Sequence, residues 1–160
     1  MTKSKNPIPP GMHTVTPYLT VRDARKAIDF YKKAFAAEEV LVIPGPENKV
    51  MHAEIKIGDS MIFLGEECRE KDVLAPESRG GATSSLMLYV PDVNTSFDRA
   101  VKAGCTVRMP LADQFWGDRF GSLADPFGHQ WSLATHVEDV SPEELKKRSE
   151  AVAKQMAGVK

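Results

Sequence analysis

A histidine and a carboxylate at neighbouring positions of one strand face are the first residues in this sequence that could do chemistry. Residues 50–57 alternate apolar and polar side chains, as a half-buried strand does, which places His52 and Glu54 on the same face. An imidazole and a carboxylate about 7 Å apart can orient each other as an acid–base pair, or they can contribute to an unusual metal site. The alternative is a solvent-facing polar edge, in which a contact between Glu54 and Lys56 is worth less than about 1 kcal/mol.

The run Trp116-Gly117-Asp118-Arg119 combines a large aromatic ring with fixed charges. An indole face beside a guanidinium suits a planar or anionic ligand. Strand alternation places Trp116 and Asp118 on one face and Arg119 on the other. The alternative is a structural network between Asp118 and Arg119 that closes a cup or a dimer seam. Tyr18, on the first expected strand, is a further candidate, either for ligand contact or for packing.

We do not expect Asp125 or most of the other histidines to take part in chemistry. We expect His13, in a Pro-rich start, to be exposed and His129 to lie at a turn, whereas His136 could line a cavity mouth. Asp125 precedes a proline, and its side chain is expected to organise that turn. No Gly-rich phosphate cradle, Ser-His-Asp spacing or zinc motif stands above chance.

The composition is that of a soluble globular protein. Of 160 residues, 42% are hydrophobic and 27% charged, which excludes collagen, coiled coils and wholesale disorder. The net charge is −1 with both signs interspersed, which argues against nucleic acid as a partner. No apolar run reaches the roughly 18 residues of a membrane helix, and the basic start has no apolar signal core. The two cysteines, Cys68 and Cys105, form no CxxC pattern, so we expect plain thiols in a cytoplasmic protein.

The candidate residues are positioned by elements whose order occurs twice. Leu19-Thr-Val-Arg-Asp23 returns as Leu88-Tyr-Val-Pro-Asp92, and each copy predicts a strand, a helix capped by the aspartate, and three further strands. Each helix carries an apolar stripe that should cover one face of its sheet, so His52 and Glu54 should lie on the opposite, open face. The expected strands are residues 14–21, 39–43, 50–57 and 60–64 in the first copy and 84–90, 106–109, 114–123 and 129–135 in the second.

The fold class is therefore α+β, with two tandem βαβββ modules and a C-terminal helix. Residues 1–12 are expected to form a flexible tail and residues 13–137 a single domain, in which module one is 13–65, a linker is 66–83 and module two is 84–137. Residues 138–160 form a helical extension, because Ser141-Pro142-Glu143-Glu144 is a helix start with a capping box, and the helix should run from 142 to about 156. Its thin apolar stripe leaves open whether it docks on the domain edge or a partner chain, or is largely solvated.

The closing signature of the second module carries a family resemblance. The sequence Phe120-Gly-Ser-Leu-Ala-Asp-Pro-Phe-Gly-His-Gln-Trp-Ser-Leu133, at the end of a duplicated module, resembles the vicinal oxygen chelate superfamily. That superfamily holds glyoxalase I, bleomycin resistance proteins, fosfomycin resistance enzymes and extradiol dioxygenases. Residues 16–31, 52–54 and 113–119 are similar to its PhnB-like branch. The resemblance covers about residues 12–137 and implies cup-shaped mixed sheets with helices on the outer face, a ligand cavity in each cup and a homodimer.

The resemblance also implies where a metal would sit. In metal-dependent members, ligands come from four strand positions, which carry Thr16, Ile62, Ser85 and Ser132 here. A hydroxyl holds a divalent metal weakly and an isoleucine cannot hold it, so we expect no metal at the usual position and no cofactor. Trp131, on the strand face opposite Ser132, should pack beneath a helix.

We therefore expect a metal-independent small-molecule binding protein, as in drug-sequestering relatives, whose cup holds an aromatic or amphipathic compound against Trp116 and Tyr18. The expected ligand-binding residues are Tyr18, His52, Glu54, Trp116 and Arg119. The alternative is a lyase, isomerase or dioxygenase that acts through a metal held by unusual ligands such as His52, Glu54 or His136. A third reading is an accessory protein with no ligand of its own. The expected partners are an unknown small molecule and a second copy of the chain, without nucleic acid or membrane, because open cups leave strand edges that associate.

Overall fold

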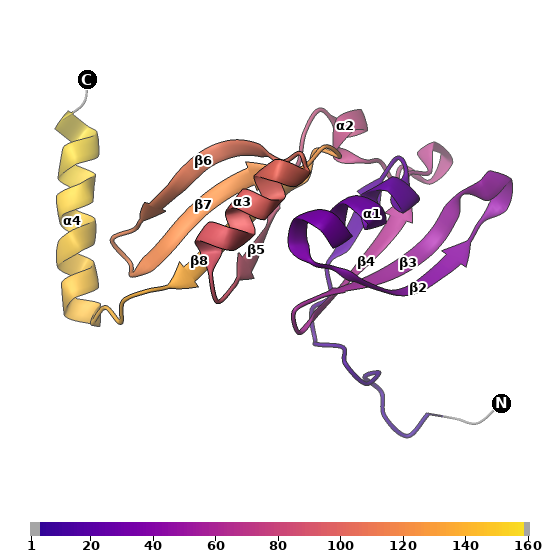
Figure 1. Ribbon diagram of the computed structural model, residues 1–160, viewed down its shortest axis with the longest axis horizontal. Coiled ribbons are helices and arrows are strands. Elements are labelled where there is room, and N and C mark those ends of the chain that lie inside the picture. The colour runs from indigo at the N-terminus through magenta and orange to yellow at the C-terminus, as the bar shows by residue number, and fades with distance from the viewer. Residues whose placement is uncertain (1–3, 159–160) are drawn as a thin grey trace.

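The computed structural model describes residues 4–158, and it contains two four-stranded mixed sheets that lie side by side (Figure 1). Residues 1–3 of the expected N-terminal tail and residues 159–160 of the C-terminal extension lie outside the described residues. The fold is α+β with two tandem modules and open sheets, as the repeated element order predicts.

The first module consists of five elements in the order strand, helix and three strands. They are β1 (Tyr18–Val21), α1 (Ala24–Phe35), β2 (Glu38–Pro44), β3 (Val50–Ile57) and β4 (Ser60–Glu66), with a single 3-10 turn, η1 (Pro46–Asn48), between β2 and β3. The strand order is β1-β4-β3-β2, with β1 parallel to β4 and the other pairs antiparallel. The first strand starts at Tyr18 rather than at residue 14, because pairing with β4 begins there and Pro17, just before it, has no amide hydrogen to donate.

The second module repeats this arrangement. It consists of β5 (Ser85–Tyr89), α3 (Val93–Ala103), β6 (Thr106–Asp113), β7 (Asp118–Ala124) and β8 (Gln130–His136), with the strand order β5-β8-β7-β6. The predicted caps are present, since the carboxylates of Asp23 and Asp92 accept hydrogen bonds from backbone amides three residues on, at 3.0 and 3.1 Å. Gly104 ends α3 at a φ of 123°, a conformation that favours glycine.

The linker between the modules contains two short helical turns. They are η2 (Arg69–Lys71) and α2 (Pro76–Arg79). Ala75 and Pro76 are buried, so the linker is anchored to the body of the protein in its middle.

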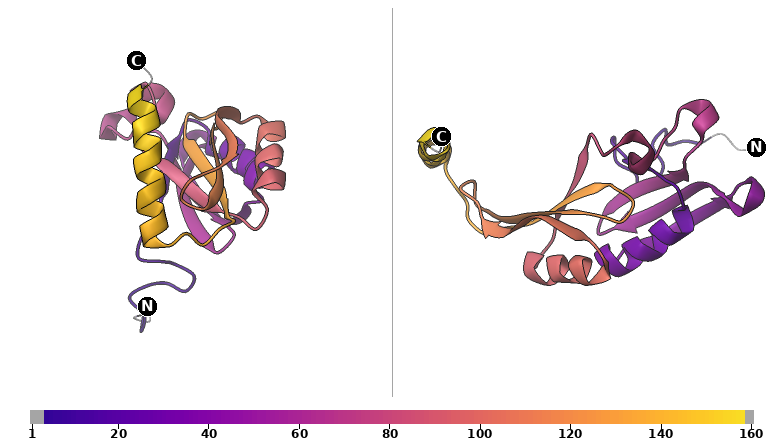
Figure 2. Two further views of the ribbon diagram at one scale, coloured as in Figure 1. Left: turned by 90° about the vertical axis from the view of Figure 1, so that its left-hand side faces the viewer. Right: turned by 90° about the horizontal axis from the view of Figure 1, so that it is seen from above.

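The two long helices cover the same side of the molecule. Helices α1 and α3 pack against each other beneath the sheets, and neither of them covers the opposite face of either sheet (Figure 2). We call this opposite side the open face of each sheet. The side chain of Trp131, on β8, is fully buried on the helix side of its sheet, as predicted. It packs against α1, which belongs to the first module. The centroid of the Trp131 ring lies 4.5 Å from that of Phe35 and 5.3 Å from that of Tyr31.

A buried carboxylate joins the two modules. One oxygen of Asp125 accepts hydrogen bonds from the amides of Phe127 and His129, both at 2.9 Å, which organises the turn as predicted. The other oxygen accepts from the Tyr31 hydroxyl at 2.7 Å and from the Trp131 indole nitrogen at 2.8 Å. Burial and the neighbouring Asp125 carboxylate raise the pKa of Tyr31 well above its usual value, so the hydroxyl stays a donor.

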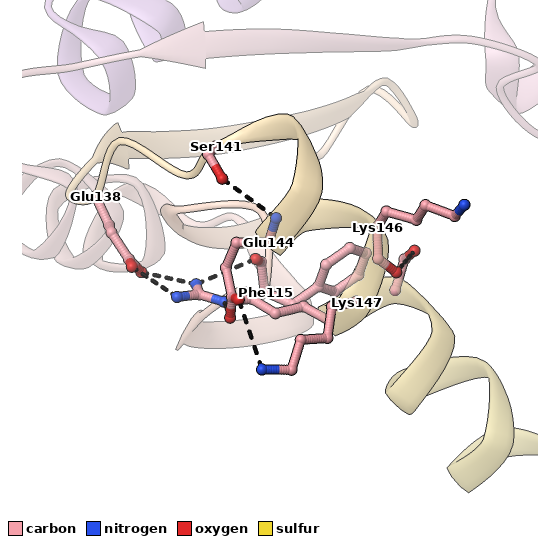
Figure 3. A network of polar contacts seen from close by, with 8 residues as sticks. Phe115, Glu138, Ser141, Glu144, Lys146 and Lys147 are labelled. Atoms are coloured by element: carbon pink, nitrogen blue, oxygen red, sulfur yellow. Dashed lines mark hydrogen bonds and ion pairs between the residues drawn. The ribbon is translucent and has the colours of Figure 1, made fainter.

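The C-terminal helix α4 (Pro142–Gly158) stands away from both sheets (Figures 1 and 2). The guanidinium of Arg148 fixes its first half, donating to both oxygens of Glu138 at 2.7 and 2.8 Å, to Glu144 and to the Phe115 carbonyl (Figure 3). No residue of 142–157 is buried, and Met156 is 74% exposed. The helix is therefore held at one end and largely solvated beyond it. Within the described chain, no helix has the length and apolar character that a membrane crossing needs.

Candidate functional site

The open face of the first sheet carries a short chain of polar and aromatic side chains. Tyr18 projects from β1, His52 and Glu54 from β3, and Phe63 from β4, where it lies directly opposite both Tyr18 and Glu54. The Tyr18 hydroxyl lies 3.0 Å from Nδ1 of His52, and Nε2 of His52 lies 3.4 Å from a Glu54 oxygen. The structure thus places three of the sequence-predicted site residues together, in the order tyrosine, histidine, carboxylate.

A glycine allows this arrangement. A Cβ atom on Gly65 would lie 3.0 Å from the Tyr18 hydroxyl oxygen and 3.1 Å from its ring, so the tyrosine lies flat across β4 over a position with no side chain. This is how Tyr18 on β1 reaches His52 on β3 although β4 separates the two strands.

The chain of contacts can transfer a proton. Both bonds are satisfied when Tyr18 donates to Nδ1 of His52 and the proton on Nε2 is donated to Glu54. A tyrosine hydroxyl beside an imidazole can pass its proton to that nitrogen, and the carboxylate then stabilises the resulting imidazolium. Tyr18 is 53% exposed, so a ligand can reach this residue.

A hollow lies beside Tyr18, which together with Thr20 and Gly65 forms part of its floor. Its volume is about 860 Å³, and its walls are the turn between β2 and β3 and the linker residues 66–73. Tyr18 and Thr20 also line a second hollow of about 390 Å³ on the other side, beneath α2 and residues 81–84. The linker therefore borders both hollows on the open face of the first sheet. The sequence predicts only that this segment joins the two modules, not that it lines a site.

The open face of the second sheet has a different centre, Asp118. This carboxylate is only 3% exposed and accepts hydrogen bonds from the Tyr89 hydroxyl at 2.8 Å, the Trp116 indole at 3.1 Å and Nδ1 of His136 at 2.9 Å. Burial disfavours its charge, but the three hydrogen bonds outweigh burial and lower the pKa of Asp118. Hydrogen bonds to Asp139 and Asp118 raise the pKa of His136, so these two carboxylates favour the protonated form of the imidazole.

Trp116 lies in a turn rather than in a strand. Residues 114–117 were expected to begin a strand, but Gly117 has a φ of 101° and its amide donates to the Gln114 carbonyl at 3.0 Å, which closes a tight turn before β7. The bond from its indole still directs Trp116 toward Asp118. From the sequence, Asp118 was expected to be a fixed charge beside Trp116 or a partner of Arg119, and its part as the common acceptor of three hydrogen bonds was not predicted.

Arg119 lies apart from the other predicted site residues. Its guanidinium bonds Asn94 of α3 at 2.9 Å and Asp113 at 3.0 Å, on the helix-covered side of the second sheet. The alternative network between Asp118 and Arg119 does not form either, because each binds other partners. Tyr18 and Trp116 lie on the open faces of different sheets.

The strand positions that hold a metal in related folds do not fit one here. Ile62 is 2% exposed and borders the same hollow as Thr16 and Ser85, but its side chain has no atom that could bind a metal. Thr16 and Ser85 border a hollow of about 330 Å³ whose large apolar lining includes Met61, Leu86, Met87 and Leu88. Hydroxyls and thioethers are poor donors for a hard divalent ion. Among residues 4–158, no group of three His, Cys, Asp or Glu side chains could hold a metal ion.

Comparison with known proteins gives matches along most of the chain. The family model of the Glyoxalase/Bleomycin resistance protein/Dioxygenase superfamily matches residues 11–133. The uncharacterized protein Rv0887c of Mycobacterium tuberculosis is 44% identical over 135 residues, which cover 82% of this chain and 79% of that protein.

Solved structures show the same fold. TioX from Micromonospora sp. ML1 is 25% identical with a TM-score of 0.63, over 78% of this chain and 99% of its own. The PhnB protein of Bacillus cereus is 21% identical with a TM-score of 0.60, over 77% and 99%. The fosfomycin resistance protein FosX of Listeria monocytogenes is 17% identical with a TM-score of 0.58, over 83% and 97%.

Proposed function

Since the chain belongs to the glyoxalase/bleomycin resistance protein/dioxygenase superfamily, we propose that it binds a small aromatic or amphipathic molecule on the open face of its first sheet. Binding uses no metal at the family's usual position. The ligand lies against the Tyr18 ring, within reach of His52 and Glu54.

The observation that carries this proposal is the accessible Tyr18, held by His52 at the floor of an 860 Å³ hollow. Hollows of about 300–1,000 Å³ are the usual size for small-molecule sites. An aromatic ring held in one orientation offers a stacking surface whose conformational entropy is already lost before binding. His52 bonds the Tyr18 hydroxyl and Glu54 bonds the other nitrogen of His52, so these two residues hold the Tyr18 ring in that orientation.

A second candidate is an acid–base enzyme of the lyase or isomerase type. It is favoured by the hydrogen-bonded order of Tyr18, His52 and Glu54, which is suited to taking a proton from a ligand and returning it. This candidate uses the same hollow, so binding is the first property to measure.

The proposal is tested with phenylnaphthylamine, an uncharged aromatic probe whose fluorescence rises in apolar surroundings. We expect Tyr18→Ala to weaken its binding by about 1–3 kcal/mol through lost stacking and area. The matched control is Tyr89→Ala, which removes an exposed tyrosine from the open face of the other sheet. Trp116→Ala tests whether the second sheet contributes to the site. Binding that survives Tyr18→Ala but is lost in Tyr89→Ala or Trp116→Ala would place the ligand on the second sheet and overturn the proposal.

We also propose that the protein is located in a reducing compartment, the cytoplasm. Cys68 and Cys105 are both unpaired, and burial raises the pKa of the Cys105 thiol to about 12, which keeps it protonated and unreactive. Mass spectrometry of protein alkylated under native conditions should find Cys68 modified and Cys105 unmodified; a bridge between them in protein purified without reductant would contradict this.

A further inference from the structure

We infer that the hollow of about 390 Å³ beneath α2 is a second binding site, which takes small molecules that present a hydroxyl or N–H group to His129. This inference goes beyond the proposed function, because it concerns a different hollow and needs no ligand on the Tyr18 ring. It is carried by one ring nitrogen of His129, which forms no hydrogen bond within residues 4–158.

The backbone of the first module fixes the proton of His129. Nε2 of its ring lies 2.9 Å from the carbonyl oxygen of Thr20, on β1. A carbonyl oxygen has no hydrogen to donate, so Nε2 must carry one and donate it. In the neutral imidazole the other nitrogen, Nδ1, therefore has a free lone pair and can act only as an acceptor.

This acceptor is accessible although the residue is almost entirely buried. Only 9% of His129 is exposed. In the part of the chain that the structure describes, every side-chain nitrogen or oxygen that is sealed from solvent has a hydrogen-bond partner, and Nδ1 has none. Nδ1 therefore belongs to the small exposed part of the side chain. Because His129 forms part of the wall of the hollow, its Nδ1 is open to a molecule inside.

The rest of the wall suits a small molecule with an apolar body. Leu74, Pro76 and Ala82 line the hollow, and its volume of about 390 Å³ is within the roughly 300–1,000 Å³ of small-molecule sites. Arg79 also lines it, but its guanidinium lies 2.9 Å from a carboxylate oxygen of Asp72 and so forms an ion pair within the protein. An acceptor that loses water without gaining a donor costs free energy. The hollow should therefore favour a ligand that can donate to Nδ1 over one of similar shape that cannot.

Phenol and methoxybenzene separate the hydrogen bond from the ring, because they differ only in whether the oxygen carries a hydrogen or a methyl group. We expect phenol to bind about fivefold more tightly, as one neutral hydrogen bond gives. In a nitrogen NMR spectrum of the histidine rings under mildly alkaline conditions, phenol should shift the Nδ1 resonance of His129 and leave its Nε2 resonance in place. Methoxybenzene should shift Nδ1 much less.

The variant His129→Gln removes the ring acceptor. Its amide nitrogen can still donate to the Thr20 carbonyl, so the link between the modules is kept, and phenol should lose its advantage over methoxybenzene. The matched control His136→Gln changes a histidine on the open face of the second sheet, outside the hollow, and should keep the full advantage.

The spectrum of the unchanged protein decides the inference even if His129→Gln is unstable. Equal binding of the two probes, or an Nδ1 resonance that phenol does not move, would overturn it. A preference for phenol that survives in a folded His129→Gln variant would place the acceptor elsewhere and overturn it as well. None of these outcomes touches the proposed function, which is tested with phenylnaphthylamine and Tyr18→Ala.

Discussion

Replacing Asp125 tests how strongly one buried carboxylate holds the two modules together. Asp125→Ala leaves the Tyr31 hydroxyl and the Trp131 indole without an acceptor, and both side chains are fully buried. Each buried donor left unsatisfied costs about 1–3 kcal/mol, and the two turn amides lose their acceptor as well. We expect the free energy of unfolding to fall by about 4 kcal/mol or more, a large part of the roughly 5–15 kcal/mol typical of a domain.

A second variant separates the hydrogen bonds from the volume. Asp125→Asn keeps the size of the side chain and one oxygen for the amides of Phe127 and His129. Its amide nitrogen can donate to the Tyr31 oxygen but cannot accept from Trp131, so we expect an intermediate loss of about 1–3 kcal/mol.

The assay is urea unfolding, followed by circular dichroism and by tryptophan fluorescence. Asp59→Ala is the control, because Asp59 lies in an exposed turn and, within residues 4–158, its side chain bonds only the neighbouring Ser60 hydroxyl. This variant should change stability by less than about 0.5 kcal/mol. A loss below about 1.5 kcal/mol for Asp125→Ala, or equal losses for alanine and asparagine, would refute the reasoning.

Four further predictions concern the site, the helix α4, the acidity of one histidine and assembly. Gly65→Ala should push the Tyr18 ring off β4 and weaken binding of phenylnaphthylamine while moving the unfolding midpoint little; unchanged affinity would show that the ring position does not matter. Arg148→Ala should speed hydrogen exchange along α4 without changing exchange in the sheets, and equal exchange in both proteins would mean that other contacts hold the helix. The His136 imidazole has a raised pKa, so the stability it contributes should be complete below its unfolded pKa and lost as pH rises through the raised value. An NMR titration of the His136 ring should show this pKa falling in Asp139→Asn, and a titration at the usual histidine pKa would contradict it. We propose a homodimer, because β2 and β6 are outer edge strands with exposed apolar side chains, and a single-chain mass in sedimentation at micromolar concentration would be inconsistent with it.

Much of the fold can be predicted from two local patterns, the alternation of apolar and polar residues in strands and the capping residues at helix starts. The alternation of residues 50–57 predicts β3 to the residue, and Asp23 and Asp92 mark the two helix starts. The predicted strand bounds are wrong where the backbone makes a turn although the side chains alternate between apolar and polar. The apolar and polar pattern of residues 114–117 fits a strand, but the backbone at Gly117 turns instead.

The candidate site is only partly predictable, because its contacts depend on register. Alternation places His52 and Glu54 on one face, yet the bond to Tyr18 requires three strands in a particular register and a glycine at position 65. Arg119 shows the opposite case: alternation along β7 correctly separates it from Asp118, but only its bond to Asn94 of α3 shows that its side of the sheet is covered. The hollow is formed by a linker whose path no periodicity encodes.

The position of the linker has a consequence for how such a protein diverges. A duplicated module begins with two equivalent sheets, but one segment joining them can lie over only one of the two open faces. In this chain it is the face of the first sheet, because the linker leaves from β4 and passes η2 and α2 before it reaches β5. Symmetry is therefore broken by the connection itself. Insertions or substitutions in residues 66–74 can reshape one face while both sheets and their shared core stay as inherited.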